Sequence, residues 1–73
     1  MHVRIPGVHA VPEIMSGTPV FIGTRVPVRA LFDYLEEDRP LAEFLGDFPS
    51  VQKSQAIGVL EHLREFVMDA TAP

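Results

Sequence analysis

The sequence predicts a small, mainly α-helical domain of three helices with a helix-turn-helix, preceded by an N-terminal β-hairpin. Apolar residues recur at three- and four-residue spacings over residues 28–67, which is typical of amphipathic helices. Residues 19–28 instead concentrate β-branched and aromatic residues on either side of Gly23-Thr24, as two short strands around a turn do.

The length and composition bound what such a chain can be. With 73 residues, 47% of them hydrophobic, the chain is long enough for one folded domain, 1–73. We expect its helix-turn-helix part to span residues 8–67, with flexible ends at 1–7 and 68–73. A core of this size supplies about 3–5 kcal/mol of net stability. Cysteine is absent, so disulfides cannot add to it, and we expect a homo-oligomer or a protein partner.

The N-terminal part holds the extended elements. Val3–Ile5 alternates as a short edge strand does, and Pro12–Met15 is expected to form one helical turn. The hairpin is expected to pair residues 20–22 with residues 26–28. Because Pro27 has no N–H to donate, the returning strand is short or lies at an edge.

Three helices follow, over residues 28–38, 40–47 and 50–67. Pro40 separates the first two, and Gly46 and Pro49 close the second. Gly58 inside the third helix is interpreted as a point of close helix packing. The apolar stripes that predict these helices are Val28, Leu31, Phe32 and Leu35; Leu41, Phe44, Leu45 and Phe48; and Ala56, Ile57, Leu60, Leu63 and Val67, with Val59 and Phe66 widening the last.

The net charge of −4 is unevenly distributed. Residues 1–29 carry three arginines and one glutamate, a balance of +2, whereas residues 30–73 carry three basic and nine acidic residues, a balance of −6. The acidic part is either a solvated helix face or a surface for a basic partner such as an RNA-cutting toxin.

No pattern of catalytic residues or cofactor ligands is present, so we expect no enzymatic activity and no cofactor. The three histidines have no helical ligand spacing, and no phosphate-binding glycine loop occurs. A secretory signal and a membrane-spanning run are also absent from these residues, which favours a cytoplasmic protein without membrane contact.

Residues 48–52 join a short helix to a longer one, as in a helix-turn-helix. In a DNA-binding domain, Lys53, Ser54 and Gln55 would then face the major groove, and Arg25 and Arg29 would contact phosphates. The alternatives are a three-helix scaffold that touches no DNA, and an Arg25 that pairs with a carboxylate or with hairpin carbonyls.

Other side chains are candidates for binding a protein partner. Tyr34 lies off the apolar stripe of the first helix. Phe66, Val67 and Met68 either complete the core or dock in a partner's groove.

Residues 11–28 read Val-Pro-Glu-Ile-Met-Ser-Gly-Thr-Pro-Val-Phe-Ile-Gly-Thr-Arg-Val-Pro-Val. This closely resembles the signature of the bacterial domain of unknown function 433 family, Pro-Glu-x-x-x-Gly-x-Pro-x-x-x-Gly-Thr-Arg-x-Pro-Val. Residues 48–51 and 55–61 resemble it too, so the resemblance covers about residues 8–63. The chain departs from the family at Gln52, where a Ser or Thr usually caps the third helix and Ser50 is the alternative cap here. It also departs at Arg39, where a small polar residue is common.

The resemblance implies a homeodomain-like or winged-helix-like fold and the role of a VapB-type antitoxin. Such an antitoxin binds and neutralises a PIN-like ribonuclease toxin and represses its own promoter DNA. Arg4, Arg25 and Arg29 are then candidates for an arginine that pairs with the toxin's catalytic carboxylates. The alternatives are a stand-alone dimeric DNA-binding regulator and a structural oligomerisation module.

Overall fold

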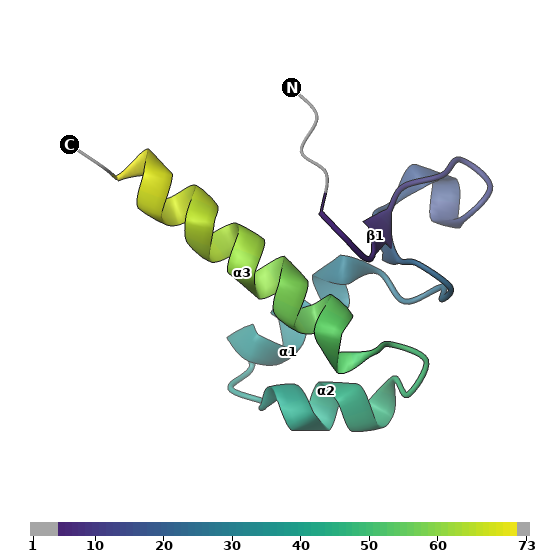
Figure 1. The fold of residues 1–73 in the computed structure, drawn as a ribbon. Helices are drawn as coiled ribbons and strands as arrows, with labels where there is room; N and C mark the ends of the chain where they lie inside the picture. Colours follow the sequence, from purple (N-terminus) through teal and green to yellow (C-terminus); the bar gives the residue numbers. More distant parts are fainter. Residues whose placement is uncertain (1–4, 72–73) are drawn as a thin grey trace.

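A computed structural model describes residues 5–71 of the chain. Its elements are strand β1 (Val8–His9), the 3₁₀ turn η1 (Met15–Gly17), strand β2 (Val20–Phe21), and helices α1 (Val28–Glu36), α2 (Leu41–Asp47) and α3 (Lys53–Ala70). α1 and α2 lie beneath the first half of α3, and the strands and η1 lie to one side (Figure 1). The predicted mainly α-helical class with an N-terminal hairpin is confirmed.

The hairpin has a different partner from the one predicted. β2 pairs antiparallel with β1, with Val8 opposite Phe21 and His9 opposite Val20. The predicted return strand at residues 26–28 is reduced to one isolated bridge between Val20 and Pro27. Pro27 offers no N–H to extend that ladder, and it serves instead as the N-cap of α1. The expected edge strand at residues 3–5 falls largely outside the described residues.

The expected helical turn at Pro12–Met15 is wrong, because the helical turn forms later, at Met15–Gly17. Met15 and Ser16 both adopt positive φ, of 50° and 56°. This is a left-handed conformation that non-glycine residues adopt at a cost of about 1–2 kcal/mol each. The hydrogen bonds of Gly17 N–H to Ile14 O and of Thr18 N–H to Met15 O hold the turn.

α1 ends two residues earlier than predicted because its end closes in a Schellman motif. Asp38 takes the left-handed conformation there, with φ of 63°. The N–H of Arg39 donates to Tyr34 O, and that of Asp38 donates to Leu35 O.

α3 begins later and ends later than predicted. Gln52 is its extended N-cap, so the alternative that Ser50 caps this helix is wrong. Thr71 closes the other end, where its hydroxyl donates to Val67 O. Gly58 does not mediate close helix packing, because a Cβ there would meet the Pro6 carbonyl oxygen at an ordinary 3.8 Å.

The core forms where the three helices and β2 meet. Phe44 of α2 is fully buried, and its ring lies 6.2 Å from that of Phe21 and 5.1 Å from that of Phe48. The buried cluster consists of Phe21, Leu31, Phe44, Val51, Ala56 and Val59. Only the first half of the α3 stripe contributes to it.

Leu31 and Leu35 lie one turn apart on α1 and form a matched pair for testing this core. Leu31 is fully buried, whereas Leu35 is 38% exposed. Leu31→Ala is expected to lower the free energy of unfolding by about 2–5 kcal/mol, which removes most of the stability of so small a core. Leu35→Ala is expected to cost far less, because its side chain leaves water only in part. Urea denaturation followed by circular dichroism measures both, and equal losses would contradict the packing described here.

Candidate functional site

The Gly-Thr-Arg segment forms a tight turn between β2 and α1. Gly23 adopts a φ of +83°, which favours glycine. The Thr24 side chain is buried, its hydroxyl donates to Phe21 O at 2.8 Å, and it accepts from Val26 N–H at 2.9 Å. Both residues therefore have a structural role in shaping the turn.

Arg25, the third residue of this segment, has no such role. Its side chain is exposed, and among residues 5–71 it has neither an ion pair nor a hydrogen bond to a carboxylate or a hairpin carbonyl. Arg29, in the first turn of α1, is likewise exposed. Ile22 and Met15 on the same N-terminal segment are 48% and 40% exposed. Arg4 lies outside the described residues.

Gln55 connects the start of α3 to the N-terminal segment. Its Nε2 donates to Gly7 O and to Ile22 O, each at 3.1 Å, and its Oε1 accepts from Gln52 N–H at 2.9 Å. Gly7 permits this approach, because a Cβ there would lie 3.0 Å from Gln55 Cγ. Both ends of the Gln55 amide are engaged within the chain, so reading a base would require breaking these bonds.

Lys53 and Ser54 are the other two residues predicted to face DNA. Both are exposed in the first turn of α3. The structure therefore leaves two of the three predicted base-reading side chains accessible, directly after the connection from α2.

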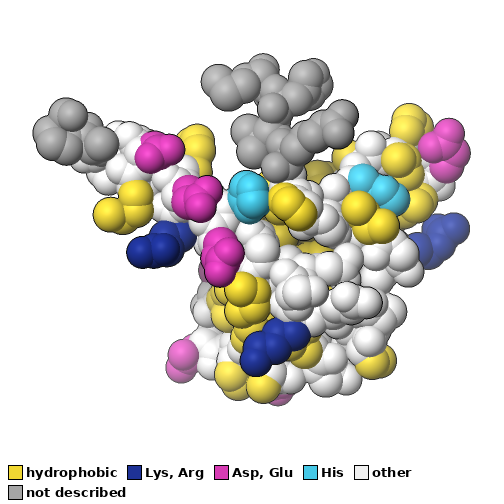
Figure 2. Space-filling model, in the orientation of Figure 1, with side chains coloured by type: hydrophobic (Ala, Val, Ile, Leu, Met, Phe, Trp, Pro, Cys, Tyr) yellow, Lys and Arg dark blue, Asp and Glu magenta, His cyan; other side chains and the backbone are white. Residues whose placement is uncertain are grey.

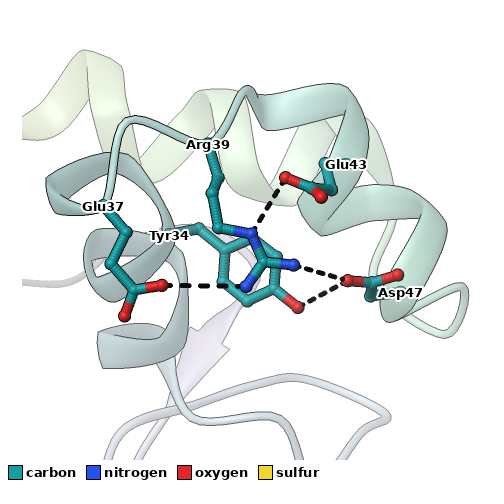
Figure 3. A network of polar contacts seen from close by, with 5 residues as sticks. All are labelled: Tyr34, Glu37, Arg39, Glu43 and Asp47. Carbon is teal, nitrogen blue, oxygen red and sulfur yellow. Dashed lines mark hydrogen bonds and ion pairs between the residues drawn. The ribbon is translucent and has the colours of Figure 1, made fainter.

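Tyr34 belongs to a polar network at the elbow between α1 and α2 (Figure 3). Its hydroxyl donates to Asp47 Oδ2 at 2.7 Å, and the Arg39 guanidinium lies 4.0 Å above its ring. Arg39 also pairs with Glu43 at 2.9 Å, Asp47 at 3.3 Å and Glu37 at 3.7 Å. This network was not predicted from the sequence, although the four-residue spacing from Arg39 to Glu43 and on to Asp47 is a recognisable signal.

The charges of this network shift two pKa values. The hydrogen bond to the Asp47 carboxylate, followed by partial desolvation, raises the pKa of Tyr34. The hydrogen bond to Glu43 raises the pKa of Arg39, which keeps the guanidinium charged. Arg39 and Tyr34 are thus occupied in fixing one helix against the next, although Tyr34 stays only half-buried.

The C-terminal half of α3 carries the remaining candidates. Phe66 is 67% exposed, Val67 47% and Met68 61%. The alternative that these residues complete the core is therefore wrong. Figure 2 shows hydrophobic and acidic side chains intermingled along this projecting helix.

An open apolar hollow of about 220 Å³ lies at the base of this projecting part. Its lining consists of Ile5, Phe32, Val59, His62, Leu63 and Phe66. Within residues 5–71, no group of three or more His, Cys, Asp or Glu side chains is placed to hold a metal ion. None of the helices described is both long and apolar enough for a bilayer crossing.

Fold and surface together define a small helical domain with a strand-turn segment that presents an exposed arginine. Residues 8–62 match the family described as protein of unknown function (DUF433), and the chain belongs to that family. No curated protein and no solved structure matches the chain.

Tyr34 is the only tyrosine of a chain without tryptophan, so its ionisation can be followed directly by ultraviolet absorbance. Since its folded pKa is raised above the ordinary value of 10.0, its contribution to stability is complete below about pH 10 and is lost as the pH rises through the folded pKa. Asp47→Asn is expected to lower the folded pKa toward the value measured in urea. A titration that is identical in folded and urea-unfolded protein would contradict the Tyr34–Asp47 bond.

Proposed function

We propose that this domain is the non-enzymatic antitoxin of a type II toxin–antitoxin module and neutralises a PIN-like ribonuclease toxin. The observation that carries the proposal is Arg25 on the Gly-Thr-Arg turn, which is exposed and has no ion pair among residues 5–71. Gly23 and Thr24 of that turn are accounted for by backbone conformation and hydrogen bonds, whereas nothing within the described fold accounts for Arg25. The toxin class comes from the family resemblance.

The chemistry of an arginine suits this target. A guanidinium pairs with carboxylates through two parallel hydrogen bonds, and its charge persists at any physiological pH. A metal-dependent ribonuclease site built from carboxylates is therefore a complementary surface for it. Inserted there, Arg25 balances part of the carboxylate charge and blocks the path of the RNA.

Two further features support an interface at this turn. The Thr24 hydrogen bonds fix the backbone on both sides of Arg25, so little backbone conformational entropy remains to be lost on binding. Ile22 on the same turn exposes 48% of its surface. An apolar neighbour that excludes water strengthens a charge pair at the centre of an interface.

Co-expression with the product of the adjacent gene tests this proposal. We expect the two proteins to co-purify and the complex to be inactive as a ribonuclease. Arg25→Ala is expected to weaken inhibition about thirtyfold or more, as loss of a central arginine does. Arg64→Ala is the matched control, because Arg64 is equally an exposed arginine but lies on α3, away from the turn. Inhibition that survives Arg25→Ala unchanged would overturn the assignment of this residue.

Two further candidate functions depend on DNA binding. One is repression of its own operon by the antitoxin, and the other is a stand-alone dimeric DNA-binding regulator in place of the antitoxin. The supporting observation is the exposure of Lys53 and Ser54 at the start of α3. Because the chain has a net charge of −4, its binding to DNA depends on a few local contacts to phosphate rather than on a positive potential over the whole surface.

A mobility-shift titration of promoter DNA over a series of salt concentrations tests DNA binding. Arg29→Ala is expected to weaken binding to all sequences and to reduce the logarithmic salt slope by about 1, because exposed Arg29 is predicted to contact phosphate. The absence of a shift at low salt would remove this candidate and leave the antitoxin proposal untouched.

A further inference from the structure

The second half of α3 is a helix without a partner. From Leu63 to Ala70 every side chain is exposed, and this part projects beyond the other elements (Figure 1). Two turns of helix are marginal in water on their own, because helical stability comes mainly from packing an apolar face. The exposed Phe66 and its neighbours therefore indicate a surface that another helix covers.

Four apolar residues of α3 form one continuous seam that runs into this part. Val59, Leu63, Phe66 and Ala70 follow one another at spacings of four, three and four, the repeat that lets two helices pack along their length. Val59 is 3% exposed against the core, whereas Leu63 is 44% and Phe66 67% exposed. The seam thus continues the buried stripe of α3 past the edge of the domain.

The hollow at the base of the projecting part matches what the seam presents. Val59, Leu63 and His62 line it together with Phe32 and Ile5, and its wall is apolar. Phe66, one turn further along α3, also belongs to its lining. One face of α3 therefore carries both a large exposed side chain and a hollow able to receive one.

We propose that two copies of this chain dimerise through the second half of α3, with the two helices antiparallel. In that arrangement Phe66 of each copy packs against Leu63 of the other copy and enters the apolar hollow of that other copy. The two copies contribute the same patch, so the interface is closed and two-fold symmetric. A parallel pair would set the two free ends side by side, where neither reaches a hollow.

The charged side chains beside the seam also favour an antiparallel orientation and a second copy of the chain as the partner. His62 and Asp69 lie on the same edge of the seam, and an antiparallel copy brings each histidine beside the other copy's Asp69. His62 Nδ1 lies 3.0 Å from Gly58 O and donates to it, so Nε2 donates to that carboxylate when the imidazole is protonated. Glu61 and Glu65 lie on the opposite side of α3 from the seam and stay in water.

The dimer is expected to be of modest affinity. The contact comprises about two turns of each helix and its hollow, which places it at the small end of specific interfaces. We therefore expect a dissociation constant in the micromolar range and a size that depends on concentration. The dimer interface does not include Arg25. Failure of the dimer to form and failure of the chain to inhibit a toxin are therefore separate outcomes.

Sedimentation or light scattering of the full chain over a concentration series provides the test. Phe66→Glu is expected to weaken the dimer about thirtyfold or more, as loss of a central aromatic contact does. Met68→Glu is the matched control: Met68 is 61% exposed, similar to the 67% of Phe66, but points away from the seam. Circular dichroism verifies that both variants fold. A chain that stays monomeric at all concentrations, or equal effects of the two variants, would overturn the proposal.

The absence of cysteine allows the orientation to be tested separately. In an antiparallel pair, residue 70 of one copy lies level with residue 59 of the other. The two thiols introduced by Ala70→Cys are therefore about 16 Å apart along the helix axis. A disulfide requires Cα atoms within about 7 Å. We expect no cross-linked dimer on mild oxidation at concentrations where the dimer forms. Rapid cross-linking would instead show a parallel pair and overturn the antiparallel arrangement.

Discussion

Burial of the Phe44 side chain is the interaction on which the rest of this small structure depends. Its ring meets Phe21 from β2, Tyr34 from α1 and Phe48 from the connection to α3. A domain of this size has no second core to replace it. The positions of the Gly-Thr-Arg turn and of α3 are both consequences of that packing.

The family signature divides into residues that build the turn and one that does not. Gly17 and Gly23 supply positive φ, Thr24 closes the turn with its hydroxyl, and Pro27 begins α1. These roles are explained by backbone geometry alone. Arg25 stands apart, since its side chain is directed into solvent without a partner among residues 5–71. The physical contrast between these residues supports a role for Arg25 in recognition rather than in folding.

The two proposed interfaces occupy different parts of the molecule and have different chemistry. The turn around Arg25 offers a positive charge on a fixed backbone for a carboxylate, whereas the second half of α3 offers an apolar seam. An antiparallel α3 pair would leave both turns accessible. The polar network of Tyr34 and Arg39 serves neither interface, because its charges are already paired across the α1–α2 elbow.

The sequence by itself determined the helical class, the order of the helices and the turn at Gly23-Thr24, because hydrophobic periodicity and glycine conformation are local properties. Tertiary structure alone decided that Val8–His9 forms the ladder with β2 while residues 26–28 keep a single bridge to it, since both segments have strand character. It also decided that the Gln55 amide donates to the carbonyl oxygens of Gly7 and Ile22 while Arg25 stays exposed, which no local pattern indicates. Finally, hydrophobic periodicity predicts the apolar face of α3 but not how much of that face the other helices cover. Val59 is buried and Phe66 is exposed because α1 and α2 lie beneath only the first half of α3.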